Sequence, residues 1–492
     1  MADGNTTPAT VWQERFNGLL ARICNLGQLV GLKLCTKAEQ AETAIQSGAL
    51  PLNPQVLDKE HTLACLIQAL DAFAKGQFNF FQNKLKSGGD RDGAPSGYTH
   101  QYALSLTLGQ ISRDLEVIER AVNQRLNIAA NVDTRRKLLV ADQLAYAALK
   151  PAIRAGILTG DLTVMTYLQK SAAIRVMPYA KIAMIGVPYT SLTNQQDLLA
   201  IPHEVGHYVY WHGNAFPDPT TGLALKIHEA LADVRLAAGG GSVPGYIKAW
   251  TEETFADYYG CCVAGPVMAL DFQDMEVHNA SDAQLLHDDG EHPLPALRAY
   301  IYLHGLKLME ELEWSEELKD EWEQKRLGNK VSFEGDAKHP PTPFTPQSGE
   351  PVRLSVARDA LIQLVNVIAP FLEVAGFKSV EGDLWRDVYA KLRPSKDVGK
   401  LYQTFEDVAR KVEASTLTVN GWDAVKDTCA SILDDNGTGL KTEILSRAKT
   451  MQILTGRYGN VSDADLEWFA MLSVGNWTTG PGGGGNPGTK GG

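Results

Sequence analysis

Two histidines and a glutamate near the middle of the chain have the spacing of a group that binds a metal and transfers a proton. His203, Glu204 and His207 belong to a His-Glu-x-x-His pentad. In a helix this spacing places the two imidazoles one turn apart on one face, with the carboxylate beside them. Because only 11 of the 492 residues are histidine, we expect such a pentad by chance in about 1–2% of similar chains. The pentad therefore predicts a zinc site with its general base in place.

A zinc ion used for hydrolysis needs three protein ligands and one open position for water, so a third ligand must come from elsewhere in the chain. A third histidine in the register H-E-x-x-H-x-x-G-x-x-H is not present, because Tyr210 and Gly213 occupy the glycine and histidine positions. His212 is one residue out of that register. The other solution is a downstream Glu with an Asp four residues later, which can accept the free N–H of a ligand histidine.

Two downstream segments contain this Glu-x-x-x-Asp pattern. Glu253 and Asp257 lie in WTEETFADYYG, whereas Glu229 and Asp233 lie in HEALADVR. In a helix, the two carboxylates of either pair share one face. Spacing alone therefore leaves both glutamates open as the third ligand. The neighbouring Glu252 lacks an Asp at the fourth following position.

Three segments between about residues 181 and 302 resemble, in content and order, the motifs of gluzincin metallopeptidases, the thermolysin-like clan. The segments IPHEVGHYVYW, WTEETFADYYG and EHPLPALRAY are similar to the motif series of the membrane CAAX-prenyl and heat-shock zinc proteases. The transmembrane helices of those proteases have no counterpart in this sequence, so their membrane substrates are not carried over. The N-terminal and C-terminal helical regions show no family resemblance.

The resemblance implies a role for each residue of the site. It favours Glu253 over Glu229 as the third zinc ligand, beside His203 and His207. It also implies that Asp257 orients the ring of a ligand histidine and fixes its tautomer.

The His-Pro and following Arg of the motif series are matched by His292, Pro293 and Arg298. We expect His292 to donate to the developing oxyanion, although His-Pro after an acidic turn also fits a helix start. Arg298 is expected to anchor an acidic group near the metal. The other candidate oxyanion donors are Tyr208, Tyr258 and Tyr259.

The mechanism expected for such a site follows from charge. Zinc lowers the pKa of its bound water and polarises the scissile carbonyl group. Glu204 then acts as the catalytic base, taking the proton of the water and delivering it to the leaving amine.

The pattern around these motifs predicts a mainly α-helical protein. Apolar residues recur at intervals of three and four from Val11 to about Leu85 and from Tyr102 through Ile157. The segment from Ile174 to Val187 is β-branched and predicts a hairpin or two strands, whose edge can pair with an extended peptide. We expect a zincin-like catalytic core with a small sheet beside the active-site helix and helical regions on both flanks. Around the motifs, helices are expected at 202–211, 224–237, 246–270 and 295–326.

Composition divides the chain into five regions. We expect a helical accessory region at 1–160, a catalytic domain at 161–333, a Pro-rich linker or loop at 334–351, a C-terminal helical region at 352–479, and a disordered Gly-rich tail at 480–492. The helical flanks are expected to gate the cleft or to bind a regulatory partner.

Charge and hydropathy exclude several classes of partner. A net charge of -12 and a pI near 5.5 argue against nucleic acid, which normally needs a basic face. The N-terminus has no secretory signal pattern and no apolar run approaches the length of a membrane span, so we expect a cytoplasmic, non-membrane protein. The six cysteines form no C-x-x-C pair, and we expect reduced thiols in the core.

The sequence therefore predicts a zinc metallopeptidase that cleaves peptide or protein substrates as an endopeptidase, with Zn²⁺ as its cofactor. The alternative is a zinc-binding helical protein that acts in interaction or regulation without catalysis. An aminopeptidase is a second rival, but the chain has no G-x-M-E-N segment for holding a free amine.

Overall fold

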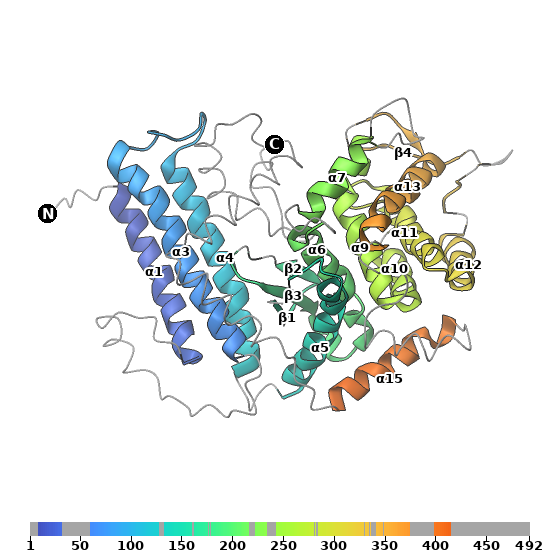
Figure 1. The fold of residues 1–492 in the computed structure, drawn as a ribbon, viewed down its shortest axis with the longest axis horizontal. Coiled ribbons are helices and arrows are strands. Elements are labelled where there is room, and N and C mark those ends of the chain that lie inside the picture. The colour runs from blue at the N-terminus through green and yellow to red at the C-terminus, as the bar shows by residue number, and fades with distance from the viewer. Residues whose placement is uncertain are drawn as a thin grey trace.

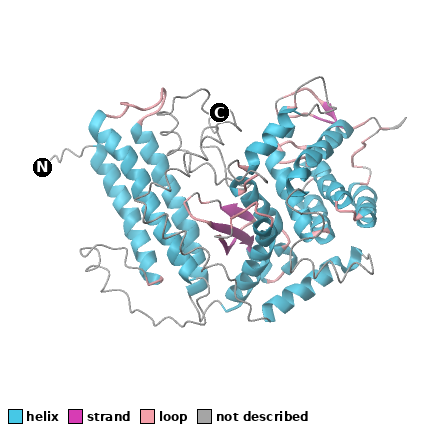
Figure 2. Ribbon diagram, in the orientation of Figure 1, coloured by secondary structure: helices cyan, strands magenta, loops and turns pink. Residues whose placement is uncertain are grey.

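The computed structural model is mainly helical, with one small sheet, as the sequence predicts (Figure 2). It describes residues 8–31, 60–126, 132–159, 162–175, 177, 179–215, 222–233, 243–279, 281, 284–328, 330–333, 335, 341–347, 349–373 and 398–414. Much of the expected C-terminal helical region and the whole Gly-rich tail lie outside these residues.

Three long helices form the N-terminal part of the structure and lie side by side (Figure 1). They are α1 (Pro8–Leu29), α3 (Glu60–Gly88) and α4 (His100–Leu126). Their apolar faces pack into one core, in which the rings of Phe16 and Phe78 stack at 3.9 Å. The periodicity of three and four in this part of the sequence is therefore that of amphipathic helices.

A three-stranded sheet lies between these helices and the rest of the protein (Figure 1). Its strands are β1 (Thr163–Gln169), β2 (Ala173–Arg175) and β3 (Ile182–Pro188), in the order β1-β3-β2. β3 pairs with β2 antiparallel, which confirms the expected hairpin, and with β1 parallel.

Strand β1 was absent from the prediction because both of its faces are buried. Met165 and Tyr167 belong to the core of the long N-terminal helices, whereas Val164 and Leu168 belong to the core of the second half. A strand that is covered on both sides has no alternation of apolar and polar residues.

The helices that follow pack into a second core on the other face of the sheet. Helix α5 packs against both β1 and α6, and α6 in turn packs against β3 and α9. The helices of this part are α5 (Val132–Arg154), α6 (Ile201–His212), α7 (Leu223–Asp233), α8 (Gly245–Ala249), α9 (Thr251–Ala264), α10 (Pro266–Asn279), α11 (Pro295–Leu308), α12 (Leu312–Asp320), α13 (Leu354–Glu373) and α15 (Leu401–Ala414). Short 3₁₀ segments lie at Tyr189–Leu192, Gln195–Leu198, Gln284–Leu286 and Val398–Lys400.

Two helices expected to be continuous are broken. The segment 246–270 is divided into α8, α9 and α10, and Gly265 separates the last two with φ +66°, a conformation that favours glycine. The segment 295–326 is interrupted after α11, where Glu310 has φ +63°. It continues as α12 and then as a π-helical segment, Glu321–Leu327.

The described part of the Pro-rich segment is packed against the second core. Within the segment expected to be a Pro-rich linker or loop, Pro343–Phe344 (β4) forms a short strand that pairs antiparallel with Val352–Arg353 (β5). Phe344 is buried and lies edge-on to Tyr246 at 5.4 Å. This segment therefore contributes to the core on which the site is built.

Helix α13 is the one described segment, at Leu354–Leu372, with the length and apolar composition of a membrane-crossing helix. Buried core helices share those properties, and α13 packs against α7, α9 and α11.

The cysteines differ from the expectation. Cys24 and Cys65 are disulfide-bonded, so the prediction of reduced core thiols was wrong for these two. Cys261 and Cys262 are free and buried.

Candidate metal centre

The candidate metal centre lies where α6 and α9 cross with their backbones in close contact. A Cβ on Gly206, inside the pentad, would lie 2.7 Å from Ala256 Cα of α9, closer than side chains tolerate. On α9, a Cβ on Gly260 would lie 3.3 Å from the backbone nitrogen of His203. Two glycines at the crossing therefore allow the backbones to approach, and α6 begins with Pro202 in its first turn.

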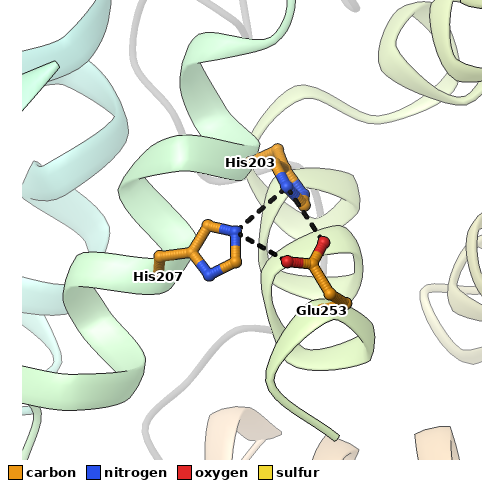
Figure 3. A group of neighbouring side chains, drawn as sticks. All are labelled: His203, His207 and Glu253. Atoms are coloured by element: carbon orange, nitrogen blue, oxygen red, sulfur yellow. Dashed lines mark hydrogen bonds and ion pairs between the residues drawn. The ribbon is translucent and has the colours of Figure 1, made fainter. Parts of the chain in front are cut away.

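Three buried side chains from these two helices converge on one point, as Figure 3 shows. His203 Nε2 and His207 Nε2 are 3.1 Å apart. His203 Nε2 lies 3.5 Å from Glu253 Oε2, and His207 Nε2 lies 3.4 Å from Glu253 Oε1. In a tetrahedral site with bonds of 2.0–2.1 Å, two ligand atoms are about 3.3–3.4 Å apart. The group can therefore hold one metal ion.

Each ligand histidine turns its other ring nitrogen toward a carboxylate. His203 Nδ1 lies 2.8 Å from Asp257 Oδ1, in a charge contact that lacks hydrogen-bond geometry. His207 Nδ1 lies 2.9 Å from Glu252 Oε1, which also accepts a hydrogen bond from Trp211 Nε1 at 2.8 Å. A carboxylate hydrogen-bonded to Nδ1, as Glu252 is to that of His207, fixes the tautomer of the ring and leaves Nε2 free for a metal.

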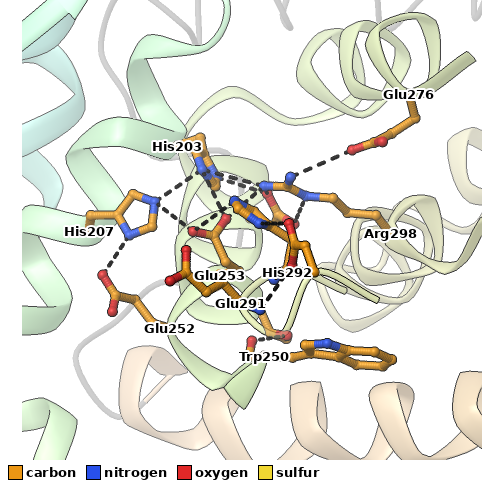
Figure 4. Close-up of polar contacts among 12 residues, drawn as sticks. His203, His207, Trp250, Glu252, Glu253, Glu276, Glu291, His292 and Arg298 are labelled. Atoms are coloured by element: carbon orange, nitrogen blue, oxygen red, sulfur yellow. Dashed lines mark hydrogen bonds and ion pairs between the residues drawn. The ribbon is translucent and has the colours of Figure 1, made fainter. Parts of the chain in front are cut away.

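Arg298 of α11 lies beside Glu253 (Figure 4) and connects it to Asp257. Its Nε and Nη2 donate to the two oxygens of Asp257 at 2.7 and 3.0 Å, and Nη2 also donates to Glu253 Oε2 at 3.0 Å. Tyr302 donates a further hydrogen bond to Asp257 at 2.8 Å. Although burial alone raises the pKa of Asp257, Arg298 and His203 hold it well below its usual value.

Glu204 is buried beside the ligand histidines, and burial raises its pKa. Its Oε2 has no hydrogen-bond partner within the described part of the chain. A buried carboxylate oxygen without a donor is costly, so this atom points to a group that the protein alone does not supply.

His292 also reaches the centre. Its Nε2 lies 3.6 Å from Glu253 Oε1, and its Nδ1 lies 2.6 Å from Asp289 Oδ2. Asp289 Oδ1 accepts hydrogen bonds from the backbone N–H groups of Glu291 and His292. Burial alone lowers the pKa of His292, but its contacts with Asp289 and Glu253 raise it above the usual value.

The pKa values of His207 and Glu253 depend on each other. Burial alone lowers the pKa of His207, yet the carboxylates of Glu253 and Glu252 raise it to about 9. Burial raises the pKa of Glu253, but His207 and Arg298 hold it below its ordinary value.

Other residues considered from the sequence lie elsewhere. Glu229 is exposed and forms an ion pair with Lys226 at 2.8 Å, so it is Glu253 that the structure brings to the histidines. His212 stacks on Tyr208 at 4.0 Å between ring centres. Tyr259 donates to the backbone oxygen of Ala148.

Two contacts of the centre were missed from the sequence. Glu252 was not expected at the site because it lacks an Asp at the fourth following position. Its carboxylate nevertheless hydrogen-bonds to Nδ1 of His207. Tyr302 was not considered, and it binds Asp257. Local spacing gives no sign of either contact, because each joins helices that are distant in sequence.

Comparisons with protein-family models, with curated proteins and with solved structures give no match.

Proposed function

We propose that this protein is a zinc-dependent endopeptidase of the gluzincin type, with His203, His207 and Glu253 as its metal ligands. The observation that carries the proposal is the convergence of these three side chains: the two Nε2 atoms are 3.1 Å apart, each lies within 3.5 Å of one Glu253 oxygen, and both Nδ1 atoms face carboxylates. Two imidazoles and one carboxylate are the ligand set of several zinc peptidases, and three ligands leave one position for water.

A bound zinc ion supplies an activated water and polarises the scissile carbonyl. Glu204 holds and moves the proton. Its pKa, raised by burial, lies closer to neutrality than that of an exposed glutamate, which suits a base that later returns the proton to the leaving amine. Glu252 and Asp257 keep the two ligand rings oriented.

His292 is the proposed donor to the oxyanion. Because Nδ1 faces Asp289, a neutral ring with its proton on Nδ1 would have no proton on Nε2. The carboxylates of Asp289 and Glu253 both face this ring and favour its doubly protonated form, in which Nε2 can donate toward the centre.

The proposed substrate is a peptide or protein chain in extended form. Among the described residues, β2 pairs with β3 on one side only, and it packs against α6. An extended peptide can add to such an edge through main-chain hydrogen bonds.

The decisive experiment is Glu204→Gln, with zinc content and peptide hydrolysis measured on the same sample. Zinc should remain at one ion per chain, while kcat falls by about 10²–10⁴ because only the base is removed. Glu229→Gln, an exposed glutamate with the same change of charge, is the matched control and should leave both unchanged.

If Glu204→Gln keeps its zinc and no peptide is cleaved by the unaltered protein either, the alternative holds, and the protein is a zinc-binding interaction or regulatory protein. If neither protein binds zinc, both proposals fail. Cleavage of peptides with blocked amino termini separates an endopeptidase from an aminopeptidase.

A further inference from the structure

A cavity of about 220 Å³ opens beside the candidate metal centre. His292 and Arg298 line it, and both also contact Glu253. The cavity and the metal ligands therefore share a wall. A substrate held at the metal would have one of its side chains within reach of this cavity.

The size of the cavity suits a single side chain. Sites for whole small molecules usually occupy about 300–1,000 Å³, which is more than this cavity offers. Two prolines, Pro293 and Pro295, form part of its wall and make that part rigid.

A buried carboxylate in this cavity lacks a hydrogen-bond donor. Glu276 of α10 lines the cavity and is only 8% exposed. Its nearest cation is Arg298 Nη1 at 3.5 Å, and within the described residues it makes no hydrogen bond. Figure 4 places Glu276 on the side of Arg298 that faces away from His203.

Arg298 cannot neutralise Glu276 alone, because it carries one charge and already hydrogen-bonds to Asp257 and Glu253. Asp289, which also lines the cavity, is already paired with His292 at 2.6 Å, so among the described residues Glu276 is the carboxylate of the cavity that lacks a donor. A buried carboxylate without a donor is unfavourable. A group that completes this cavity must therefore bring N–H donors to Glu276, and a cationic group would also balance its charge, because Arg298 is shared with Asp257 and Glu253.

We propose that the cavity binds the side chain of a lysine or arginine of the substrate, close to the bond that is cleaved. An ammonium group offers three donors and a guanidinium five, and either can bind Glu276. This inference rests on the proposed peptidase function and adds a substrate class to it.

The test compares peptides that differ at one residue, which is lysine, norleucine or glutamate. Norleucine keeps the aliphatic chain of lysine and lacks the ammonium group. The residue is moved through the three positions on each side of the cleaved bond. At one position, the unaltered protein should cleave the lysine peptide with kcat/KM at least tenfold above the norleucine peptide, and the glutamate peptide most slowly.

Glu276→Gln should reduce that ratio of lysine to norleucine to below about threefold. Glu291→Gln is the matched control, because Glu291 is an exposed acid on the neighbouring loop that does not line the cavity. This control should keep the ratio. Melting temperature and zinc content establish that each variant is folded, and the peptide series on the unaltered protein does not depend on any variant.

The outcomes separate the two proposals. Cleavage without preference for a basic residue at any position, or a preference that persists in Glu276→Gln, overturns the cavity assignment and leaves the peptidase intact. If no peptide is cleaved, the peptidase proposal fails. Binding to the zinc-loaded Glu204→Gln protein then decides the cavity: tighter binding of the lysine peptide than of the norleucine peptide supports it, and equal binding overturns it.

Discussion

Gly206 lies directly against the backbone of Ala256. A Cβ at Gly206 would be 2.7 Å from Ala256 Cα and 2.9 Å from its carbonyl oxygen. Backbone atoms of a packed helix cannot rotate away as the end of a long side chain can. The distance between α6 and α9, and with it the distance between the histidines and Glu253, therefore depends on glycine at this position.

Gly206→Ala should push the two helices apart. We expect a loss of about 1–3 kcal/mol in the free energy of unfolding, as for other overpacked cores, together with weaker zinc binding. Denaturant unfolding and zinc titration measure the two effects. Gly18→Ala, at an exposed position of α1 with no atom within 4 Å of the new Cβ, should instead be neutral or slightly stabilising. Equal behaviour of the two variants would contradict the role given to Gly206.

Glu252→Ala should weaken zinc binding by about 10–100-fold, because His207 loses the partner that orients its ring. Trp211→Phe removes only one donor to Glu252, so its effect should be smaller. Competition with a chelator of known affinity measures both. An unchanged zinc affinity in Glu252→Ala would remove Glu252 from the centre.

Arg298→Met should destabilise the protein by about 3–5 kcal/mol, because it leaves Asp257 and Glu253 buried without their shared cation. Arg120→Met is the control. It breaks an exposed pair with Glu116 one helical turn away, which we expect to cost at most about 0.5 kcal/mol. A small effect at Arg298 would mean that water or another cation compensates these carboxylates.

The stability of the protein should fall in mild acid through His228. Burial, the larger cause, and the charge of Lys248 lower the pKa of His228 from 6.5 to about 4. The unfolded chain therefore binds a proton between pH 6.5 and 4 that the folded chain does not, and stability decreases as the pH falls through this range. The full effect is on the order of 3 kcal/mol.

His228→Gln should flatten that pH dependence, since glutamine does not titrate and can still bind the hydroxyl of Tyr210. The free energy of unfolding at pH 7 and pH 4.5 measures the difference. If the free energy of unfolding depends on pH equally in the variant and the unaltered protein, the acid sensitivity comes from groups other than His228.

The parts of the site that depend on local spacing were predictable from the sequence. His203, Glu204 and His207 share one helix, so their relative positions follow from the pitch of that helix. The choice between Glu253 and Glu229 was not predictable from spacing, since both begin the same pattern. What decides it in the structure is the close packing of α9 on α6, and the two glycines at that crossing are its sequence signature.

The overall helical class and the β2–β3 hairpin were also predictable, because their periodicities are local. The missed features depend on tertiary contacts. Strand β1 reads as a short apolar run, since it is covered on both faces. The break at Glu310 has no glycine or proline to mark it, and its positive φ is evident only in the folded chain.

On the chain, Glu253 follows His207 by 46 residues and His203 by 50, and this separation has a consequence for folding. In the unfolded chain, only the two histidines are close enough in sequence to bind an ion together. Bringing the distant carboxylate to them costs loop-closure entropy. An ion bound by all three groups acts as a removable crosslink that exists only in the native state. Tight metal uptake would then report the folded fraction of the molecule, and stripping the ion should lower the melting temperature in proportion to how tightly it was held.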